Sequence, residues 1–279
     1  MMLQAILLDL DGTLLTDQKM ISPRTKQTLL DLQAEGIKVV LASGRPKRGI
    51  EPFADELRLH EYGGLIVSSN GACVTDATTN ETLFKQAIHP NDARAILDHL
   101  TGFDVIPMIN DETYMYVNDV FSGMLELNGE PFNIIEYESR GGRFRLREAP
   151  RLADAIDFPV YKILVAGQPD YLQAHAASLA GPFTDRVTGM FTAAMYYEFT
   201  DLGIDKARAL DHVFQNIGIS RDRVIAFGDG HNDRSIIEYA GIGVAMGNAV
   251  EDILTIATEV TTSNNEDGIA TVLSRYLTT

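Results

Sequence analysis

The sequence predicts an α/β protein in which helices pack on a parallel β-sheet and a separate α+β domain is inserted into the chain. Short aliphatic runs alternate with segments of helical periodicity in the first third of the chain and again after about residue 200. This alternation is typical of parallel strands joined by helices. The middle of the chain instead mixes extended runs with isolated helical segments. We therefore expect a core domain from residues 1–84 and 191–279, and an inserted domain at residues 85–190.

The first strands and the helix between them follow from local sequence. Three continuous apolar runs are typical of strands that are buried on both faces: residues 5–8, 37–42 and 65–68. Between the first two runs, Ser22 suits a helix N-cap, Pro23 the first helical position and Gly36 the helix end. A strand, a helix and a second parallel strand are therefore predicted before residue 43.

The remaining elements are predicted from the same signals. After residue 200 we expect a helix near 205–216 ended by Gly218, a strand at 224–227, a helix from Asn232, a strand at 242–245 and two more short units of helix and strand. In the insert we expect a helix at 91–100, extended runs at 105–109 and 114–117, a Gly141-Gly142 pair, a strand at 162–166 and a helix after Pro169. No repeat of fixed period occurs, so a solenoid is not expected.

Composition places the chain among ordinary globular proteins. It has 279 residues, of which 45% are hydrophobic and 22% charged, and this suits about two domains with sizeable cores. Lys and Arg number 23 against 39 Asp and Glu, a net charge of -16, so broad binding to nucleic acid or to an anionic membrane is not expected. An anionic substrate must therefore be held by a local group of positive charges.

Cysteine content and hydropathy suggest where the protein works. Cys73 is the single cysteine, so no intramolecular disulfide is possible, and no Cys/His set has the spacing of a zinc site. No run of about 18 uncharged apolar residues occurs, and Asp9 and Asp11 interrupt the apolar start before it reaches the length of a signal peptide. We expect a cytoplasmic protein.

Polar residues follow the predicted strands at the edge where parallel sheets bind ligands. Asp9, Asp11, Gly12 and Thr13 follow the first strand, and Asp229 follows a later one. Carboxylates so close together repel one another unless a cation or a proton lies between them. Oxygen ligands of this kind suit Mg²⁺, so the pattern predicts a magnesium site.

The first of these acids has the chemistry to attack a phosphate monoester. Gly12 permits a tight turn directly after the strand and so exposes both Asp9 and Asp11. Asp9 as nucleophile would form an aspartyl-phosphate, while Asp11 would protonate the leaving oxygen and then activate water. The alternative, an ordinary Asp-Gly turn at a strand end, does not explain why further acids recur elsewhere.

Two other segments can bind phosphate. Ser43 and Gly44 follow the second strand, so a hydroxyl and N–H groups can meet phosphate oxygens at a helix start, although a helix cap is the alternative. Arg45 can face the same anion or lie in solvent. Lys206 begins a predicted helix, where a cation is poorly matched to the helix dipole, so a bound anion would explain it better than a surface position.

The last polar segment supplies two more acids. Asp229 and Asp233 lie four residues apart, one in a loop and the other on the first helical turn, so both can face one ion. Asp229 is expected to bind the ion directly, and Asp233 to act through water or by orienting Lys206. Asn232 can bind phosphate or cap the helix. A purely structural role would leave Asp229 unexplained.

Taken in order, these motifs resemble those of the haloacid dehalogenase superfamily. The resemblance spans nearly the whole chain and rests on Asp9-Leu10-Asp11-Gly12-Thr13-Leu14, Ser43-Gly44-Arg45, Lys206 and Gly228-Asp229-Gly230-His231-Asn232-Asp233. Within this superfamily the chain is similar to the Cof-type phosphatases with a C2 (C2B-like) cap, which include bacterial sugar phosphatases. This similarity rests on the long insert, the Ser69-Asn70-Gly71-Ala72 segment and residues 263–268. Ala207 departs from the Gly that often follows the lysine in such sequences.

The resemblance implies a Rossmann-like core, an α+β cap that covers the site, and Mg²⁺-dependent phosphoryl transfer. It makes Asp9 the nucleophile and a metal ligand, and Asp11 the acid/base whose backbone carbonyl also reaches the metal. Asp229 would be the third ligand, with Asp233 outside it. The residues expected around the phosphoryl group are Gly12, Thr13, Ser43, Gly44, Lys206 and Asn232.

Four further residues are candidates for substrate contact: Arg45, Asn70, His231 and Asn264. Each has a structural alternative, because asparagine is frequent in turns and an exposed His or Arg can simply face solvent. The aromatic residues of the insert, including Tyr114, Tyr116 and Phe121, are expected in its core rather than against a ligand.

The expected function is a Mg²⁺-dependent phosphatase that hydrolyses small phosphate monoesters, with sugar phosphates as favoured substrates and no nucleic-acid or membrane partner. A phosphomutase or phosphotransferase would use the same nucleophile and pass the phosphoryl group to a sugar hydroxyl. A non-catalytic sensor of phosphorylated metabolites would not need Asp9 and Asp11, which are both present. The physiological substrate and the oligomeric state stay open.

Overall fold

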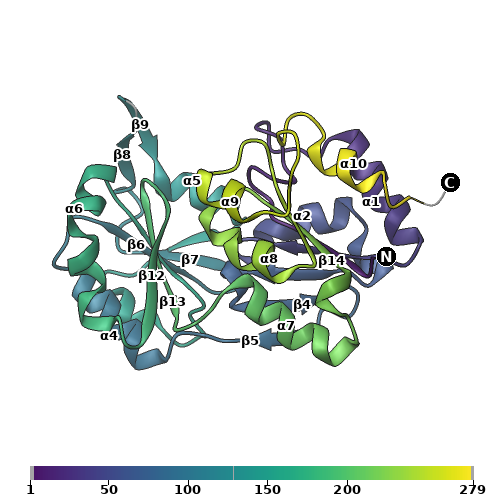
Figure 1. Ribbon diagram of the computed structural model, residues 1–279. Helices are drawn as coiled ribbons and strands as arrows, with labels where there is room; N and C mark the ends of the chain where they lie inside the picture. Colours follow the sequence, from purple (N-terminus) through teal and green to yellow (C-terminus); the bar gives the residue numbers. More distant parts are fainter. Residues whose placement is uncertain (1–2, 128, 278–279) are drawn as a thin grey trace. The chain divides into compact units, whose positions relative to one another are not determined.

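The computed structural model describes residues 3–127 and 129–277 (Figure 1). The chain forms two compact units, one from Met1–Lys85 with Asp205–Thr279 and the other from Gln86–Ile204. The expected boundary after residue 190 falls inside a strand of the second unit. Strands β12 (Val187–Ala193) and β13 (Tyr196–Asp201) pair with each other and complete that unit's sheet, so the chain rejoins the first unit only at Asp205.

The first unit contains an eight-stranded sheet in the order β16-β15-β14-β1-β2-β3-β4-β5. Six of these strands are parallel: β1 (Ala5–Leu8), β2 (Lys38–Ala42), β3 (Leu65–Ser68), β14 (Val224–Gly228), β15 (Ile242–Ala245) and β16 (Glu259–Val260). The prediction of a parallel sheet shared by both ends of the chain is confirmed. Two antiparallel strands, β4 (Cys73–Asp76) and the edge strand β5 (Thr82–Lys85), follow β3 in the sheet and were not predicted.

Alternation along the parallel strands divides the core of this unit between the two faces of its sheet. Successive side chains of a strand point to opposite faces, so Ile6 and Leu8 join one buried cluster while Ala5 and Leu7 join another. The strand residues that contribute to the two clusters are all apolar. This explains why the strands read as continuous hydrophobic runs rather than as alternating ones.

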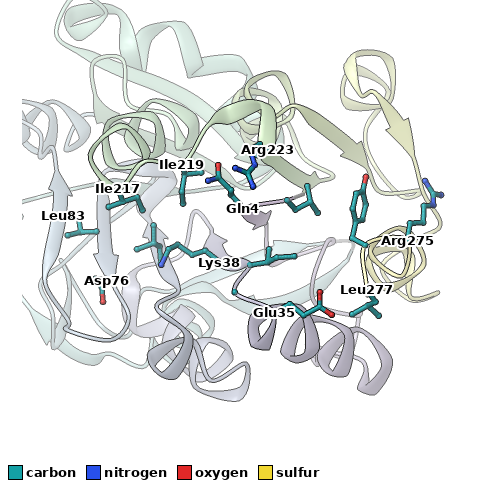
Figure 2. Close-up of a pocket in the computed structure, with 15 residues that line it drawn as sticks. Gln4, Glu35, Lys38, Asp76, Leu83, Ile217, Ile219, Arg223, Arg275 and Leu277 are labelled. Carbon is teal, nitrogen blue, oxygen red and sulfur yellow. The ribbon is translucent and has the colours of Figure 1, made fainter. Parts of the chain in front are cut away.

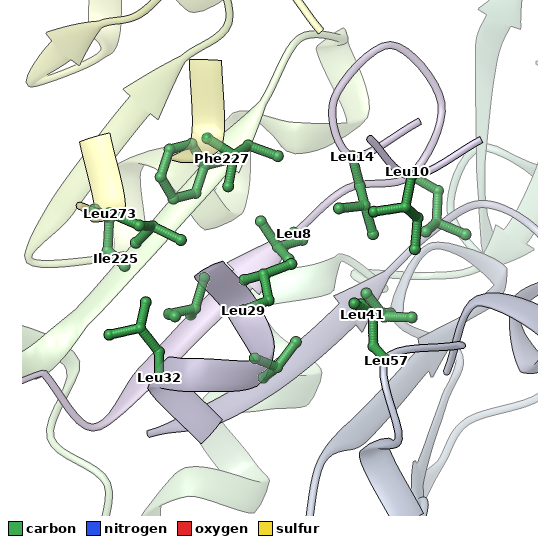
Figure 3. Packing of buried hydrophobic residues seen from close by; sticks show 14 of the residues in the cluster. Leu8, Leu10, Leu14, Leu29, Leu32, Leu41, Leu57, Ile225, Phe227 and Leu273 are labelled. Atoms are coloured by element: carbon green, nitrogen blue, oxygen red, sulfur yellow. The ribbon is translucent and has the colours of Figure 1, made fainter. Parts of the chain in front are cut away.

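Helices from both ends of the chain cover these faces. Those in this unit are α1 (Pro23–Ala34), α2 (Lys47–Glu56), α3 (Leu59–Tyr62), α7 (Lys206–Ile217), α8 (Arg234–Tyr239), α9 (Glu251–Ile256) and α10 (Gly268–Leu273). Figure 3 shows one face, where Leu29 and Leu32 of α1 and Leu273 of α10 pack with Leu8 and Phe227 of the sheet. On the other face α7, α8 and α9 contribute to the second cluster.

Local capping signals set the helix boundaries near the site. Ser22 Oγ accepts a hydrogen bond from Thr25 N at 3.1 Å, which confirms the predicted N-cap of α1. Asp205 caps α7 in the same way, accepting from Arg208 N at 2.8 Å. The helix expected from Asn232 begins later, because residues 231–233 form a 3₁₀ turn, η5, and the α-helix α8 starts at Arg234.

The second unit is an α+β domain, as predicted. Its six-stranded sheet has the order β10-β7-β6-β11-β13-β12, and a separate hairpin joins β8 to β9. Besides β12 and β13, its elements are α4 (Pro90–Leu100), β6 (Ile106–Asn110), β7 (Tyr114–Val117), β8 (Met124–Leu127), β9 (Glu130–Asn133), α5 (Ile134–Gly141), β10 (Arg145–Glu148), β11 (Ile163–Ala166) and α6 (Pro169–Ala180). The strands β8, β9, β10, β12 and β13 were not predicted.

Exposure to solvent explains why β10 and β12 were missed. All four residues of β10 are exposed, and most of β12 is only half-buried, so neither carries the apolar run by which the buried strands were recognised.

No helix among residues 3–127 and 129–277 is both long and apolar enough to cross a membrane.

The core of the first unit gives a stability prediction. Phe227 is completely buried on β14. Phe121 is 88% exposed, so its expected place in the core of the insert is wrong. Truncation of Phe227 removes buried apolar surface and leaves a cavity, so Phe227→Ala should lower the free energy of unfolding by about 3–5 kcal/mol. Phe121→Ala serves as the matched control and should change it by less than about 0.5 kcal/mol. Chemical denaturation measures both; equal effects would contradict this assignment of the core.

Candidate active site

The carboxyl ends of three neighbouring strands bring the predicted site residues together. Asp9 follows β1, Ser43 follows β2 and Asp229 follows β14, and β1 lies between the other two strands. The sheet hydrogen bonds continue into these loops: Asp9 N donates to Phe227 O at 3.2 Å and Ser43 N donates to Val67 O at 2.9 Å. The starts of the loops after β1 and β2 are therefore held by the sheet itself.

Lys206, the first residue of α7, lies between two buried carboxylates. Its Nζ donates to Asp9 Oδ1 and to Asp233 Oδ1, each at 2.6 Å. Lys206 and Asp233 are completely buried, and Asp9 is 5% exposed. The second oxygen of Asp233 accepts from the backbone N–H groups of Asp229 and Gly230, both at 3.0 Å. Asp233 thus orients the lysine and closes the turn that carries Asp229.

The charges in this group do not balance. Burial raises the pKa of Asp9 well above its ordinary value, with the Asp233 carboxylate adding to the rise. Burial and Asp233 likewise raise the pKa of Asp229 to about 6. Burial by itself would lower the pKa of Lys206, but Asp233 and Asp9 outweigh it and raise that pKa. Three ionised carboxylates facing one ammonium would lack two positive charges, which is the charge of one divalent cation.

The acids also have the geometry of a metal site. One carboxylate oxygen from each of Asp9, Asp229 and Asp233 lies within 4.8 Å of the others. Both oxygens of Asp233 are engaged, but Asp9 Oδ2 and Asp229 Oδ2 accept no hydrogen bond within the described part of the chain. These two oxygens fit a hard divalent cation, with Asp233 behind them. The division of roles expected from the sequence stays a prediction.

Gly12 leaves the space that this arrangement needs. Its backbone has a φ of +81°, a conformation that favours glycine, and a Cβ there would lie 2.3 Å from Asp229 Oδ2. Thr13, the next residue, donates from Oγ1 to Asp229 Oδ1 at 2.7 Å. The loop after β1 therefore positions Asp229 directly, and any larger residue at position 12 would displace it.

Asp11 faces two cations. Arg45 donates to it through two nitrogens, from Nε to Oδ2 and from a terminal nitrogen to Oδ1, both at 2.7 Å. Lys19 Nζ donates to Oδ1 at 2.7 Å as well. Partial burial favours a higher pKa for Asp11, but the pairing with Arg45 and Lys19 outweighs it and the pKa is lowered. Lys19 was not predicted as a site residue, because a lysine in a surface turn is ordinary.

The loops after β2 and β3 meet the acidic loop through amide groups. Ser43 is buried, and its Oγ accepts from Arg45 N at 3.1 Å. Asn70 N donates to Ser43 O at 3.1 Å, and Asn232 Nδ2 donates to Asn70 Oδ1 at 3.0 Å. A Cβ on Gly44 would lie 3.1 Å from that same Asn70 oxygen. The structure thus brings Ser43, Gly44, Asn70 and Asn232 into one group.

Two of the substrate candidates lie apart from this group. His231 is exposed on η5, with Nδ1 3.6 Å from Asp252 Oδ2. Asn264 is buried, and its amide Nδ2 donates to Leu15 O at 2.8 Å, so that group holds the chain rather than facing a ligand. Sequence reasoning also missed Asn248, whose Nδ2 donates to Gly12 O at 2.8 Å. A single asparagine in a turn carries no signal of such a contact.

A cavity of about 940 Å³ lies at the opposite end of the same strands (Figure 2). It is bordered by Gln4 before β1, by Lys38 at the start of β2 and by Arg223 before β14. Ligands of open α/β sheets bind beyond the carboxyl ends of the strands, where the acids lie. The acidic cluster, not this cavity, is therefore the candidate active site.

Comparison with known proteins identifies the family. Residues 6–273 match the family of haloacid dehalogenase-like hydrolases. The chain belongs to this family. A crystal structure of a haloacid dehalogenase-like hydrolase from Bacteroides thetaiotaomicron superposes with a TM-score of 0.88 at 33% identity, covering 98% of this chain and 99% of that one. The resemblance and the fold class predicted from the sequence are both confirmed.

Curated relatives of this haloacid dehalogenase-like hydrolase are named as phosphatases. One is "Putative phosphatase YxeH" of Bacillus subtilis, 31% identical over 274 residues that cover 96% of each chain. Another is the 5-amino-6-(5-phospho-D-ribitylamino)uracil phosphatase YitU of the same organism, 29% identical over 97% of this chain and 96% of that protein. With these relatives, the chain is a phosphatase of the haloacid dehalogenase-like family.

The buried lysine yields a stability prediction. Lys206→Met puts a slightly shorter, uncharged side chain in place of the ammonium and leaves Asp9 and Asp233 buried beside each other without a counter-charge. We expect the free energy of unfolding to fall by about 3–5 kcal/mol. In Lys206→Met/Asp233→Asn one of the two unpaired charges is also gone, so part of the loss should return. Denaturation at pH 7 without added metal compares the three proteins. If Lys206→Met has the same free energy of unfolding as the wild type, the contacts of Lys206 with Asp9 and Asp233 do not stabilise the site.

Glycine 12 gives a second, local prediction. In Gly12→Ala the new Cβ overlaps Asp229, and the residue must also keep a positive φ. We expect the affinity for Mg²⁺ to fall about 10-fold or more, because the displaced carboxylate is a proposed ligand. Gly129→Ala, which also has a positive φ but has open space around it, is the matched control. Calorimetric titration with Mg²⁺ measures both, and equal affinities would contradict the steric argument.

Proposed function

We propose that this chain is a Mg²⁺-dependent phosphatase that moves the phosphoryl group of a small phosphate monoester first to Asp9 and then to water. The observation that carries the proposal is the buried Lys206 ammonium, bonded to Asp9 and Asp233 next to Asp229. In this arrangement the Asp9 carboxylate is a nucleophile beside a fixed positive charge, the Lys206 ammonium. We propose for the other site residues the roles that were expected from the sequence.

In the first step, a carboxylate oxygen of Asp9 attacks phosphorus and the bond from phosphorus to the ester oxygen breaks. The leaving oxygen takes a proton from Asp11, and the phosphoryl group stays on Asp9 as an acyl phosphate. In the second step, Asp11 takes a proton from water, whose oxygen attacks the same phosphorus. The products are the alcohol, inorganic phosphate and the restored carboxylate of Asp9.

Positive charge stabilises both transition states. Lys206 already touches Asp9, so it can follow the negative charge as it moves between the nucleophile and the phosphoryl oxygens. Mg²⁺ bound by Asp9, Asp229 and the backbone carbonyl of Asp11 would neutralise phosphoryl oxygens and offset the charge of the acids. Donor groups of Gly12, Thr13, Ser43, Gly44 and Asn232 complete the proposed phosphate site.

Asp11 must change partners before it can act as an acid. It is bound by Arg45 and Lys19 in this structure, and both contacts favour its ionised form. We propose that the substrate phosphate draws Arg45 toward itself and so releases Asp11 toward the leaving oxygen. In this proposal Arg45 then contacts the substrate.

The proposed substrates are phosphorylated small metabolites, with sugar phosphates first among them. The YitU relative acts, by its name, on a phospho-D-ribityl compound, which is a phosphate ester of a polyol. All acids and amides of the site come from the first unit, so we assign the choice of substrate to the second unit, as a cap. We place the enzyme in the cytoplasm, since its single cysteine forms no intramolecular disulfide.

Phosphate release tests this function. A panel of sugar, nucleotide and coenzyme monophosphates is incubated with the wild type and Asp9→Asn, with Mg²⁺ or with EDTA. We expect metal-dependent release that falls at least about 1,000-fold in Asp9→Asn, because the nucleophile is lost. Asp252 is an exposed acid near His231, and the control variant Asp252→Asn should retain activity. Rapid quenching followed by mass spectrometry should find the phosphoryl group on Asp9.

Other outcomes of the panel would favour the alternatives. Transfer of the phosphoryl group to an added sugar, instead of release, would indicate a phosphotransferase. No release by folded protein that still binds phosphate esters would indicate a sensor. Release that persists in Asp9→Asn would contradict the proposed nucleophile.

A further inference from the structure

Asn248 lies in the exposed turn after β15 and contacts the loop that carries the nucleophile. Its Nδ2 donates to Gly12 O at 2.8 Å. Its other amide atom, Oδ1, accepts from Asn264 N at 3.0 Å. Since one end of the amide meets a carbonyl and the other meets an N–H, the side chain can satisfy both groups in one orientation only. Asn248 is therefore fixed although it lies at the surface.

The contact with Gly12 closes a ring around Asp229. Thr13, which follows Gly12, donates to Asp229 Oδ1 at 2.7 Å. Val250, two residues after Asn248, donates from its backbone N–H to Asp229 O at 2.9 Å. The side chain and the main chain of Asp229 are thus each held, one through the loop after β1 and the other through the turn after β15. Asn248 is the side chain that joins these two segments.

The peptide group after Gly12 needs such a contact. Glycine has no side chain to restrict its backbone, and Gly12 adopts a positive φ. Thr13 N donates to Leu10 O at 3.4 Å, so one end of this peptide group has only a long hydrogen bond. The other end, Gly12 O, is held by Asn248. Without the amide, rotation of this peptide group would carry Thr13 away from Asp229.

We propose that Asn248 is a positioning residue for the reaction, one that fixes Asp229 relative to Asp9 through Gly12 and Thr13. This inference rests on the proposed function, because it gives Asp229 the role of a metal ligand. Asn248 thereby keeps Asp9 Oδ2 and Asp229 Oδ2, the two oxygens that accept no hydrogen bond in the described part of the chain, in position to bind the cation. Residues that orient metal ligands in this way commonly affect metal affinity or activity by about 10- to 100-fold.

Asn265 offers a matched control. It is also an exposed asparagine that bonds to the segment after β1, but its contacts are with Asp17: it accepts from Asp17 N at 3.1 Å and donates to Asp17 Oδ2 at 3.0 Å. Asn265→Ala removes a similar pair of hydrogen bonds without touching Gly12. Any general effect of loosening this surface should therefore appear in both variants, and an effect on Asp229 only in Asn248→Ala.

The experiment measures Mg²⁺ binding by calorimetry and the Mg²⁺ dependence of phosphate release for both variants. For Asn248→Ala we expect the affinity for Mg²⁺ to fall about 10-fold or more, with turnover partly restored at saturating Mg²⁺. For Asn265→Ala we expect both quantities within about 2-fold of the wild type, since surface substitutions have small effects. Circular dichroism checks that both variants are folded.

A double substitution tests the ring. If Asn248 acts through Thr13, then Thr13→Val and Asn248→Ala disturb the same contact with Asp229, and the loss in Mg²⁺ affinity of the double variant should be smaller than the product of the two single losses. Asn248→Asp is a second test that preserves the shape of the side chain. It keeps an acceptor for Asn264 N but cannot donate to Gly12 O, so it should lose affinity as Asn248→Ala does.

Equal Mg²⁺ affinities for Asn248→Ala, Asn265→Ala and the wild type would overturn the inference, and so would independent effects of Asn248 and Thr13. Failure of the proposed function gives a different result, since a wild type that binds Mg²⁺ without releasing phosphate still allows the calorimetric comparison. A wild type that hydrolyses esters while Asn248→Ala is unaltered would refute this inference alone. Absence of both metal binding and hydrolysis in the wild type would refute both.

Discussion

The buried pairing of Lys206 with Asp9 and Asp233 is the interaction on which the rest of the site depends. Three carboxylates this close together repel one another, and two of them, Asp9 and Asp233, are buried, so the cluster needs a counter-charge. Lys206 neutralises part of this charge and does so from the start of α7, a segment far from β1 in the sequence. The pairing therefore joins the beginning of the chain to its last third and still leaves a deficit that a divalent cation would fill.

The parallel sheet makes this pairing possible. Strands β14, β1 and β2 are neighbours, so three loops leave the sheet at one edge, and the apolar side chains on both faces hold them there. The site itself contains few apolar groups and could not hold its own geometry. Backbone hydrogen bonds between the loops, such as those to Ser43 O and Asp229 O, transmit the rigidity of the sheet to the acids.

Asp11 shows that proximity in sequence does not decide a partner. It lies two residues from Asp9, yet its carboxylate binds Arg45 and Lys19 while Asp9 binds Lys206. The chain turns directly after β1, so Asp9 lies in the buried cluster while Asp11, two residues later, is partly exposed. In the proposed reaction this separation matters, because one acid must attack while the other moves protons. The two roles need different electrostatic surroundings.

The sequence by itself determined the α/β class, the positions of five of the six parallel strands and the order of the motifs, because buried runs, capping residues and closely spaced acids are local signals. It also indicated Lys206, since a cation at a helix start has no local reason to be there. Only the tertiary structure decided that Lys206 bridges Asp9 and Asp233, that Arg45 binds Asp11, that Asn264 holds Leu15 and that Asn248 reaches Gly12. These contacts join loops that are distant in the chain, and the half-exposed strands β10 and β12 likewise form only because a neighbouring strand pairs with them. A hydrogen bond between distant segments leaves no periodic mark on either one.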